Sequence, residues 1–206
     1  MVLNQVSSRN KDLLKLNQTL EARVEERTKA LSDANLHLEE LALTDTLTNL
    51  PNRRHALRLL DALWKESIQF NRPLSCMMID ADHFKDVNDI HGHDAGDVVL
   101  TELAKALQHS FRTDDIVCRL GGDEFLILCP DTDHDGGMYI ADVVLKTVSE
   151  LKVQTGGSFW NSSISVGVAT RAEAMNNYED LIKLADRGVY AAKQDGKNCV
   201  RSEVAL

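Results

Sequence analysis

The stretch RLGGDEFLIL, residues 119–128, places two glycines and two acids between runs of apolar residues. Residues 126–128 are typical of a buried strand, and the apolar residues Ile116, Val117 and Leu120 precede the glycines in the same style. Gly-Gly-Asp is favourable chemistry for a tight turn between two antiparallel strands. Because a buried carboxylate without a partner is costly, Asp123 and Glu124 either lie in solvent at this turn or bind a ligand.

The composition describes a chain with a substantial core and an excess of negative charge. Hydrophobic residues make up 43% of the 206 residues, and 32 acidic against 23 basic residues give a net charge of −9. Broad nucleic-acid binding is disfavoured, because a phosphate backbone needs a cationic face. No run approaches the roughly 18 apolar residues of a membrane helix, and no signal peptide is expected. We expect a cytoplasmic protein whose scattered cysteines are reduced core residues: Cys76, Cys118, Cys129 and Cys199.

Residues 1–43 contain neither proline nor glycine and follow one heptad register without a break. The a positions are Leu3, Asn10, Asn17, Val24, Leu31 and Leu38, and the d positions are Val6, Leu13, Leu20, Arg27, Ala34 and Leu41. This spacing predicts a coiled coil, and asparagine at a favours a parallel pair of helices. The alternative is a helix packed on its own domain, but about 40 residues would reach roughly 60 Å, longer than such a domain. We therefore predict a dimerisation and signalling helix over 1–43 and one domain over 44–206.

Residues 44–206 alternate between helical and strand patterns. Helical spacing is found over 52–70, 97–111, 136–151 and 178–196, and strand patterns over 74–80, 115–130 (two strands), 161–170 and 198–202. Strands that alternate with helices and include one hairpin predict an α/β (α+β) sandwich. In this fold, helices flank a central, mainly antiparallel sheet.

Several acids follow the ends of predicted strands. Asp80 ends the strand 74–80, Asp82 follows two residues later, and the hairpin delivers Asp123 and Glu124. If these strands are adjacent, the carboxylates meet at one edge of the sheet and repel one another unless a cation lies between them. A few hard oxygen ligands favour Mg²⁺ shared with substrate phosphates over an all-protein Ca²⁺ cage. The alternative for each single acid is a solvated turn residue.

The segment HFKDVNDIHGHDAGD, residues 83–97, is rich in groups that form hydrogen bonds. Asn88 and Asp97 can read the edge of a base, since a carboxylate accepts from two adjacent N–H donors and an amide both donates and accepts. Lys193 and Lys197 lie four residues apart and can hold phosphates as point charges, although two such lysines also suit an ordinary surface. Residue chemistry thus favours a Mg²⁺-dependent nucleotide enzyme.

Four motifs occur in order: DTLTNLPNRR at 45–54, DADHFKDVND at 80–89, GHDAGD at 92–97 and GGDEF at 121–125. Together they resemble the GGDEF family of diguanylate cyclases, from about residue 42 to 201. The heptad segment lies outside this region and is similar to the helical linkers that often precede the family's domain. The resemblance implies a nucleotidyl-cyclase, palm-like fold. It also implies an enzyme that condenses two GTP into cyclic di-GMP and two pyrophosphates.

The resemblance assigns the acids to a metal site. Asp80, the backbone carbonyl of Ala81 and Asp123 match the family's ligands for Mg²⁺, with Mn²⁺ as an alternative. Glu124 matches the second acid of the signature, which the family uses near the metal and the attacking hydroxyl. Asp123 and Glu124 are therefore the expected catalytic residues.

The resemblance also assigns residues to the substrate. Those that match the family's GTP contacts are the backbone N–H groups of His83 and Phe84, the guanine-reading Asn88 and Asp97, and the phosphate-binding Lys193 and Lys197. The family often has arginine where Lys197 stands. Backbone N–H groups at a helix start suit phosphate oxygens.

Two further expectations concern control of the enzyme. Each domain of the family holds one GTP, so catalysis needs two facing domains and a homodimer. Arg112 and Asp115 resemble the family's inhibitory RxxD site for cyclic di-GMP, with a surface i,i+3 ion pair as the alternative. Residues 131–152 lack the arginine that strongly inhibited members add, which predicts weaker inhibition. An inactive module that binds GTP or cyclic di-GMP is the alternative function, and a sensor is expected upstream of the heptads.

Overall fold

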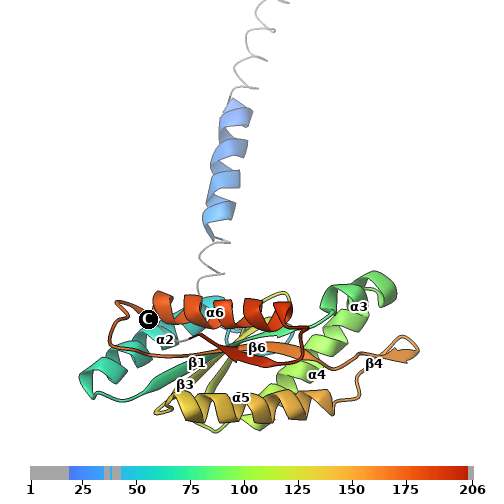
Figure 1. Cartoon of the computed structure of the whole chain (residues 1–206). Coiled ribbons are helices and arrows are strands. Elements are labelled where there is room, and N and C mark those ends of the chain that lie inside the picture. Colours follow the sequence, from blue (N-terminus) through green and yellow to red (C-terminus); the bar gives the residue numbers. More distant parts are fainter. Residues whose placement is uncertain (1–18, 35–37, 39–42, 204–206) are drawn as a thin grey trace, which may run out of the picture. The chain divides into compact units, whose positions relative to one another are not determined.

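The computed structural model describes residues 19–34, 38 and 43–203. The chain divides into two units, one ending at Ala42 and the other beginning at Leu43. In the first unit, residues 19–34 are helical and exposed along their whole length (Figure 1). The heptad positions within 1–18, 35–37 and 39–42 lie outside the described residues. None of the helices described is long and apolar enough to cross a membrane.

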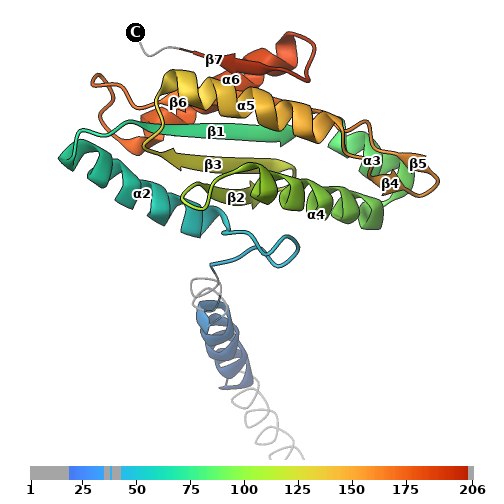
Figure 2. The same cartoon turned by 90° about the horizontal axis from the view of Figure 1, so that it is seen from below.

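A five-stranded sheet forms the centre of the second unit, in the order β2-β3-β1-β6-β7 (Figure 2). Its strands are β1 (Leu74–Ala81), β2 (Ile116–Gly121), β3 (Glu124–Pro130), β6 (Ile164–Thr170) and β7 (Val200–Ser202). The β6–β7 pair is parallel, and the other three pairs are antiparallel. The predicted mainly antiparallel sheet is therefore confirmed. All eight residues of the central strand β1 are buried, which explains its uninterrupted apolar run.

Four helices cover the two faces of this sheet. The helices α2 (Arg53–Gln69) and α6 (Tyr178–Gln194) lie over one face. The helices α4 (His93–Ser110) and α5 (His134–Ser149) lie over the other, and Figure 2 shows the layers from below. Each helix turns a buried apolar stripe toward the strands, as its sequence period predicts. Two hydrophobic cores result, one on each side of the sheet.

Three small elements have bounds that the sequence patterns did not predict: one helix, of which only the start was expected, and the two strands of a short hairpin. Helix α3 (Phe84–His91) buries only Val87, so it has no apolar stripe that a periodic pattern could reveal. The strands β4 (Gln154–Thr155) and β5 (Ser158–Phe159) form a separate hairpin of two residues a side. Strands this short show no alternation. Helix α4 also begins earlier than the pattern at residue 97 suggested, at His93.

Candidate active site

The predicted acids meet where β1 ends beside the β2–β3 turn. The antiparallel register pairs Asp80 with Glu124, and the backbone N–H of Ala81 donates to the carbonyl of Asp123 at 3.2 Å. The adjacent strands thus bring Asp80, Asp123 and Glu124 to one edge of the sheet.

Asp80 lies in a buried and negatively charged position. It is 8% exposed, and the ammonium of Lys193 on α6 donates to its Oδ2 at 2.6 Å. Burial raises the pKa of Asp80, the charges of Asp123 and Asp82 raise it further, and Lys193 only partly offsets them. A cation bound beside Asp80 would relieve this unfavourable charge.

Asp123 and Glu124 leave their carboxylates available to a ligand. Asp123 is half-buried, Glu124 is exposed, and neither side chain has a hydrogen bond or ion pair with another described residue. Within the described residues, no three His, Cys, Asp or Glu side chains gather into a ready metal cage. A metal here would need backbone, substrate or water oxygens as further ligands.

The turn that carries Asp123 is held by an arginine. Gly121 and Gly122 have φ of 142° and 55°, values that glycine adopts without strain. The guanidinium of Arg119 donates to the carbonyl of Gly122 at 2.8 and 3.1 Å, and to Oδ1 of Asp45 at 2.8 Å. Burial would raise the pKa of Asp45, but hydrogen bonds from Thr48 and Arg119 outweigh it and lower the pKa. The segment from 45 onward therefore supports the turn.

Asp82 does not join the other acids. It is 1% exposed and accepts hydrogen bonds from Ser163 at 2.8 Å, from Ser165 at 2.7 Å and from the backbone N–H of Asn198 at 3.0 Å. Asn198 belongs to the turn after α6, where residues 196–198 all have positive φ. Asp82 thus fixes the turn that carries Lys197, and the idea that it converges with Asp80 and Asp123 is corrected.

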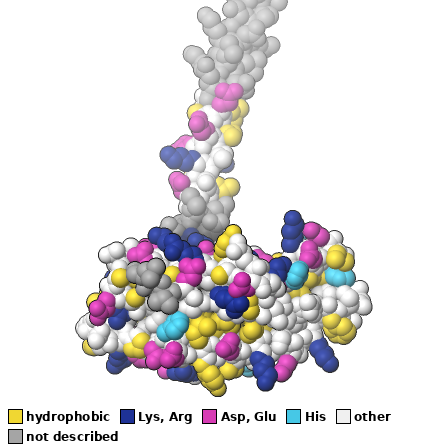
Figure 3. Space-filling model, viewed as in Figure 1, with side chains coloured by type: hydrophobic (Ala, Val, Ile, Leu, Met, Phe, Trp, Pro, Cys, Tyr) yellow, Lys and Arg dark blue, Asp and Glu magenta, His cyan; other side chains and the backbone are white. Residues whose placement is uncertain are grey.

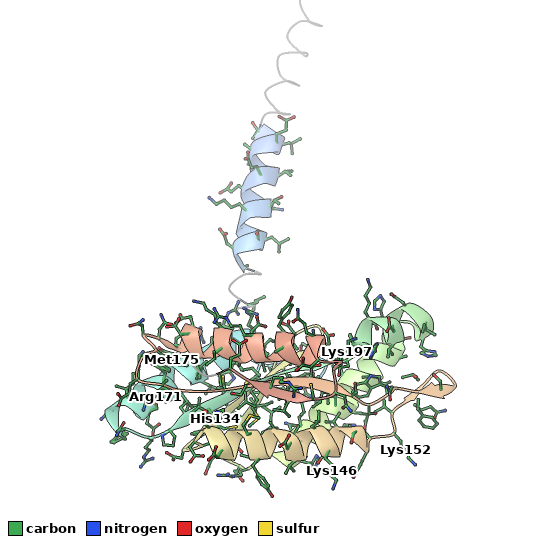
Figure 4. All side chains as sticks on the ribbon, in the orientation of Figure 1. His134, Lys146, Lys152, Arg171, Met175 and Lys197 are labelled. Carbon is green, nitrogen blue, oxygen red and sulfur yellow. The ribbon has the colours of Figure 1, made fainter. Side chains whose placement is uncertain are left out.

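The two predicted lysines lie on different elements, Lys193 within α6 and Lys197 in the turn after it. Figure 4 shows Lys197 at the end of α6 that lies toward α3. Its ammonium is 3.4 Å from Nε2 of His83, which caps the start of α3 with a φ of 61°. Because Phe84 is the first residue of α3, the N–H groups at this helix start lie near Lys197. Positive charge and helix-start N–H groups together suit phosphate oxygens.

Asn88 presents an unsatisfied group beside Asp97. Its Oδ1 is buried without a hydrogen-bond partner, although buried polar atoms are normally paired. The side chain lies against Gly96, where an added Cβ would come within 2.1 Å of that oxygen. Asp97 follows on α4 with an exposed carboxylate. A ligand with N–H donors would satisfy both side chains.

Arg112 and Asp115 form a compact turn before β2. The backbone N–H of Arg112 donates to Oδ2 of Asp115, and the N–H of Asp115 to the carbonyl of Arg112, both at 3.1 Å. Their side chains form no ion pair, so the i,i+3 surface pair that was the alternative is not present. Both residues line an open hollow of about 460 Å³, together with Phe111 and Thr113.

The family described as "Diguanylate cyclase, GGDEF domain" matches residues 42–199. The chain belongs to the GGDEF domain family. Its core carries the family's fold, an α+β sandwich with a mostly antiparallel sheet between helices.

Several relatives of this GGDEF chain are similar over most of its length, and some of them are named diguanylate cyclases. The response regulator PleD of Caulobacter vibrioides is 38% identical over 98% of this chain and 46% of PleD. The crystal structure of diguanylate cyclase SiaD from Pseudomonas aeruginosa, in complex with its activator SiaC, has a TM-score of 0.72 at 32% identity, over 94% of this chain and 74% of SiaD. The coiled coil and GGDEF domain of DgcB from Caulobacter crescentus, in complex with c-di-GMP, also has a TM-score of 0.72, at 27% identity over 89% of this chain and 99% of that chain. The chain spans about half the length of the curated relatives first named, such as PleD.

Sequence reasoning missed the support that this GGDEF site receives from Arg119 and Asp45. Asp45 lies in one of the four motifs, but no role was assigned to it. The available signal was a basic residue within the apolar strand β2, two residues before the first glycine. A charge at such a position needs a partner, and the only uncertainty was which acid supplied it.

Proposed function

We propose that this chain is a diguanylate cyclase that condenses two GTP into cyclic di-GMP and two pyrophosphates. The observation that carries the proposal is the meeting of Asp80, Asp123 and Glu124 at the end of β1, beside Lys193. The alternative is an inactive module that binds GTP or cyclic di-GMP. Intact and unpaired carboxylates on Asp123 and Glu124 favour turnover over binding alone. GTP as substrate and four free cysteines favour a cytoplasmic site of action.

Mg²⁺, or Mn²⁺ in its place, fits the residues at this edge. Asp80, Asp123 and the carbonyl of Ala81 would hold it, and the scarcity of protein ligands leaves positions for phosphate oxygens. Burial raises the pKa of Asp80, the charges of Asp123 and Asp82 raise it further, and a cation bound there would offset the repulsion between these carboxylates. When bound, the metal would neutralise phosphate charge and make the attacking hydroxyl more acidic.

The chain's own residues then place the nucleotide. Asn88 and Asp97 hold the guanine, and Lys197 with the N–H groups at the start of α3 holds the triphosphate. Lys193 exchanges its contact with Asp80 for a phosphate oxygen. The 3′-oxygen of a second GTP bonds to the α-phosphorus, the bond from that phosphorus to the bridging oxygen breaks, and pyrophosphate leaves with the electron pair. Glu124 receives the hydroxyl proton.

Two domains must face each other, because each chain contains one set of these residues and two bonds are made. Holding both reactants in place supplies several kcal/mol of the acceleration, as effective molarities do. The helix before the domain is suited to pairing two copies, because its apolar side chains Leu20, Val24, Leu31 and Leu38 are 49–64% exposed. Figure 3 shows hydrophobic side chains at the surface of this helix. These four residues are at heptad a and d positions, so a second copy of the helix would bury them.

Product inhibition through Arg112 and Asp115 is the final part of the proposal. Asp115 is nearly buried and pinned to the backbone, whereas Arg112 is exposed and its guanidinium has no ion-pair partner among the described residues. An arginine free to bind phosphate or guanine in a bidentate manner, beside an open hollow, suits cyclic di-GMP.

One assay tests the function. The full chain with GTP and Mg²⁺ should yield cyclic di-GMP and pyrophosphate in a ratio of one to two, measured after chromatographic separation.

Asp123→Asn should reduce turnover on the order of 100-fold or more while the circular dichroism spectrum is unchanged. ATP should be rejected by several orders of magnitude, since adenine lacks the N1–H and N2–H donors of guanine from which Asp97 would accept hydrogen bonds. GTP binding by the unaltered chain without turnover would establish the binding module instead.

A further inference from the structure

A hollow of about 130 Å³ beside the acids contains side chains that the proposed function leaves unused. Asp80, Glu124 and Lys193 line it, together with Asp186, Val189 and Tyr190 of α6. Asp186 and Tyr190 are four residues apart on a helix, so they share one face of α6. The hollow is therefore an extension of the site along α6.

Tyr190 is unusually placed for an aromatic residue. Its side chain is 65% exposed, and neither its hydroxyl nor the carboxylate of Asp186 has a hydrogen bond or ion pair within the described residues. An exposed ring offers a face for stacking on a sugar or a base, and its hydroxyl adds a polar contact. Both side chains are thus free for a ligand at the edge of the catalytic acids.

The lining decides which part of a nucleotide fits. The proposed function already uses Asp80, Glu124 and Lys193, which lie at one end of the hollow beside the phosphates. The remaining polar groups are the carboxylate of Asp186, which accepts hydrogen bonds, and the hydroxyl of Tyr190, so this part of the hollow suits a group with O–H or N–H donors. Sites that enclose a whole ligand usually measure about 300 Å³ or more, so this smaller hollow fits a ribose. A ribose offers hydroxyl donors to Asp186 and an apolar face to the ring of Tyr190.

The domain's own GTP has other contacts. Its guanine is assigned to Asn88 and Asp97 on α3 and α4, and α4 covers the opposite face of the sheet from α6. The attacking hydroxyl must come from the second GTP and reach the α-phosphorus beside Asp80 and Glu124. We propose that Asp186 and Tyr190 receive the ribose of this attacking GTP, which the partner copy of the chain presents. The inference rests on the proposed function, and it adds an acceptor subsite to it.

Mixed dimers test whether the subsite acts on the partner's nucleotide. Dimers with one copy of each kind are isolated by two affinity tags. The reference dimer pairs the unaltered chain with Asp123→Asn and should form one bond, which gives the linear dinucleotide pppGpG. When the partner of Asp123→Asn carries Tyr190→Ala, the copy with working acids lacks the receiving ring. Linear product should then fall on the order of 10- to 100-fold, as for a misplaced reactant.

A rearranged dimer supplies the decisive comparison. With Asp123→Asn and Tyr190→Ala in the same copy and an unaltered partner, linear product should return to the reference level. The opposite pattern, with the rearranged dimer defective and the first one active, would mean that Tyr190 orients its own domain's GTP. That result overturns the inference and leaves the proposed function intact. A reference dimer that makes no dinucleotide overturns both.

Matched variants separate positioning from folding. Asp186→Asn in place of Tyr190→Ala should reproduce the pattern, whereas Tyr139→Ala, a 71%-exposed tyrosine of α5, should keep the reference yield. Binding of the α,β-methylene analogue of GTP, measured by calorimetry with Mg²⁺, should change less than about twofold in Tyr190→Ala, which is within about 0.4 kcal/mol. A loss of affinity as large as the loss of product would place Tyr190 on the domain's own nucleotide and refute the subsite.

Discussion

Asp80 carries a charge in a place where the fold disfavours it. Its raised pKa means that the folded state binds a proton more tightly than the unfolded state does. The protonated Asp80 therefore contributes to the free energy of unfolding. This contribution is fully present below the pKa of Asp80 in the unfolded chain, about 4, and is lost as the pH rises through its pKa in the folded chain. At neutral pH, the ionised Asp80 therefore costs stability, which is expected for a group retained for binding a cation.

Replacing Asp80 should separate stability from activity. Asp80→Asn removes the disfavoured charge, and Lys193, with 40% of its side chain exposed, can turn to water. We expect a higher melting temperature at pH 7, a gain that shrinks as the pH falls toward about 4, and loss of cyclase activity. Thermal unfolding at several pH values measures this, with Asp142→Asn on the surface of α5 as a neutral control. A loss of stability at every pH would show that the Lys193 contact outweighs burial.

Because Gly96 has no side chain, the amide of Asn88 can pack directly against it. In Gly96→Ala the new Cβ would come within 2.1 Å of Oδ1, so the amide must swing away. Helix propensity favours alanine by about 1 kcal/mol, so the fold should persist. We expect KM for GTP to rise roughly tenfold or more, with a smaller change in kcat. In an Asn88→Ala background the same substitution should have no further effect on KM, and additive effects would contradict the proposed contact.

At the scale of elements, the β2–β3 hairpin depends on a long-range clamp. Arg119 joins the turn at Gly122 to Asp45, and its side chain is only 10% exposed. The lowered pKa of Asp45 means that this acid stabilises the fold above about pH 4, and that the stability is lost as the pH falls through its folded pKa. The clamp holds the strand ends that present Asp123 and Glu124.

Arg119→Lys tests the clamp, because it keeps the charge and removes the forked donors. We expect the free energy of unfolding to fall by about 1–3 kcal/mol. We also expect kcat to fall roughly tenfold with little change in KM, since the acids rather than the GTP contacts are displaced. The matched control is Arg72→Lys, whose exposed contact with Asp131 is 3.4 Å long and should contribute under about 1 kcal/mol. If both substitutions lower the free energy of unfolding and kcat equally, the contacts of Arg119 do not support the turn more than an exposed ion pair would.

The turn before β2, which contains Arg112 and Asp115, allows a test of product inhibition. Arg112→Ala should raise the late yield of cyclic di-GMP more than the initial rate, because it relieves inhibition without touching the acids. Full progress curves, corrected for GTP depletion, measure the difference. Curves of identical shape for both proteins would remove Arg112 from the inhibitory site. Added cyclic di-GMP should lower the rate of the unaltered chain and leave the rate of Arg112→Ala unchanged.

At the scale of the whole molecule, activity should follow dimer formation. Val24→Glu with Leu31→Glu places charges at two exposed a positions, which a paired helix would bury. We expect a monomer by sedimentation and a cyclase rate that rises with the square of protein concentration. Ser32→Glu adds a charge outside the a and d positions and should keep the dimer. A stable dimer in the double variant would show that the helix is not the dimer contact.

The sequence predicted the elements whose periodicity is strong. The buried run of β1, the hairpin at residues 119–128 and the stripes of α2, α4, α5 and α6 are local patterns that strand and helix geometry imposes. Because adjacent antiparallel strands align their ends, the meeting of Asp80 with the hairpin acids also follows from the pattern. Helix α3 and the β4–β5 hairpin leave no such pattern, and they emerge only from packing.

Only the tertiary structure decided which residue forms a hydrogen bond or an ion pair with each of these charged side chains. Asp80 and Asp82 are two residues apart in one motif, yet β1 ends at Ala81 and the chain turns at His83, so their side chains reach different neighbours. The partners of Asp82 lie 81, 83 and 116 residues away, and those of Arg119 include an acid 74 residues away. The sequence by itself determined that Asp80 and the hairpin acids lie at neighbouring strand ends, because antiparallel strands joined in one sheet align their ends. Which acid stays open to a ligand depends on long-range contacts, because a buried carboxylate is stable only where the folded chain brings donors to it.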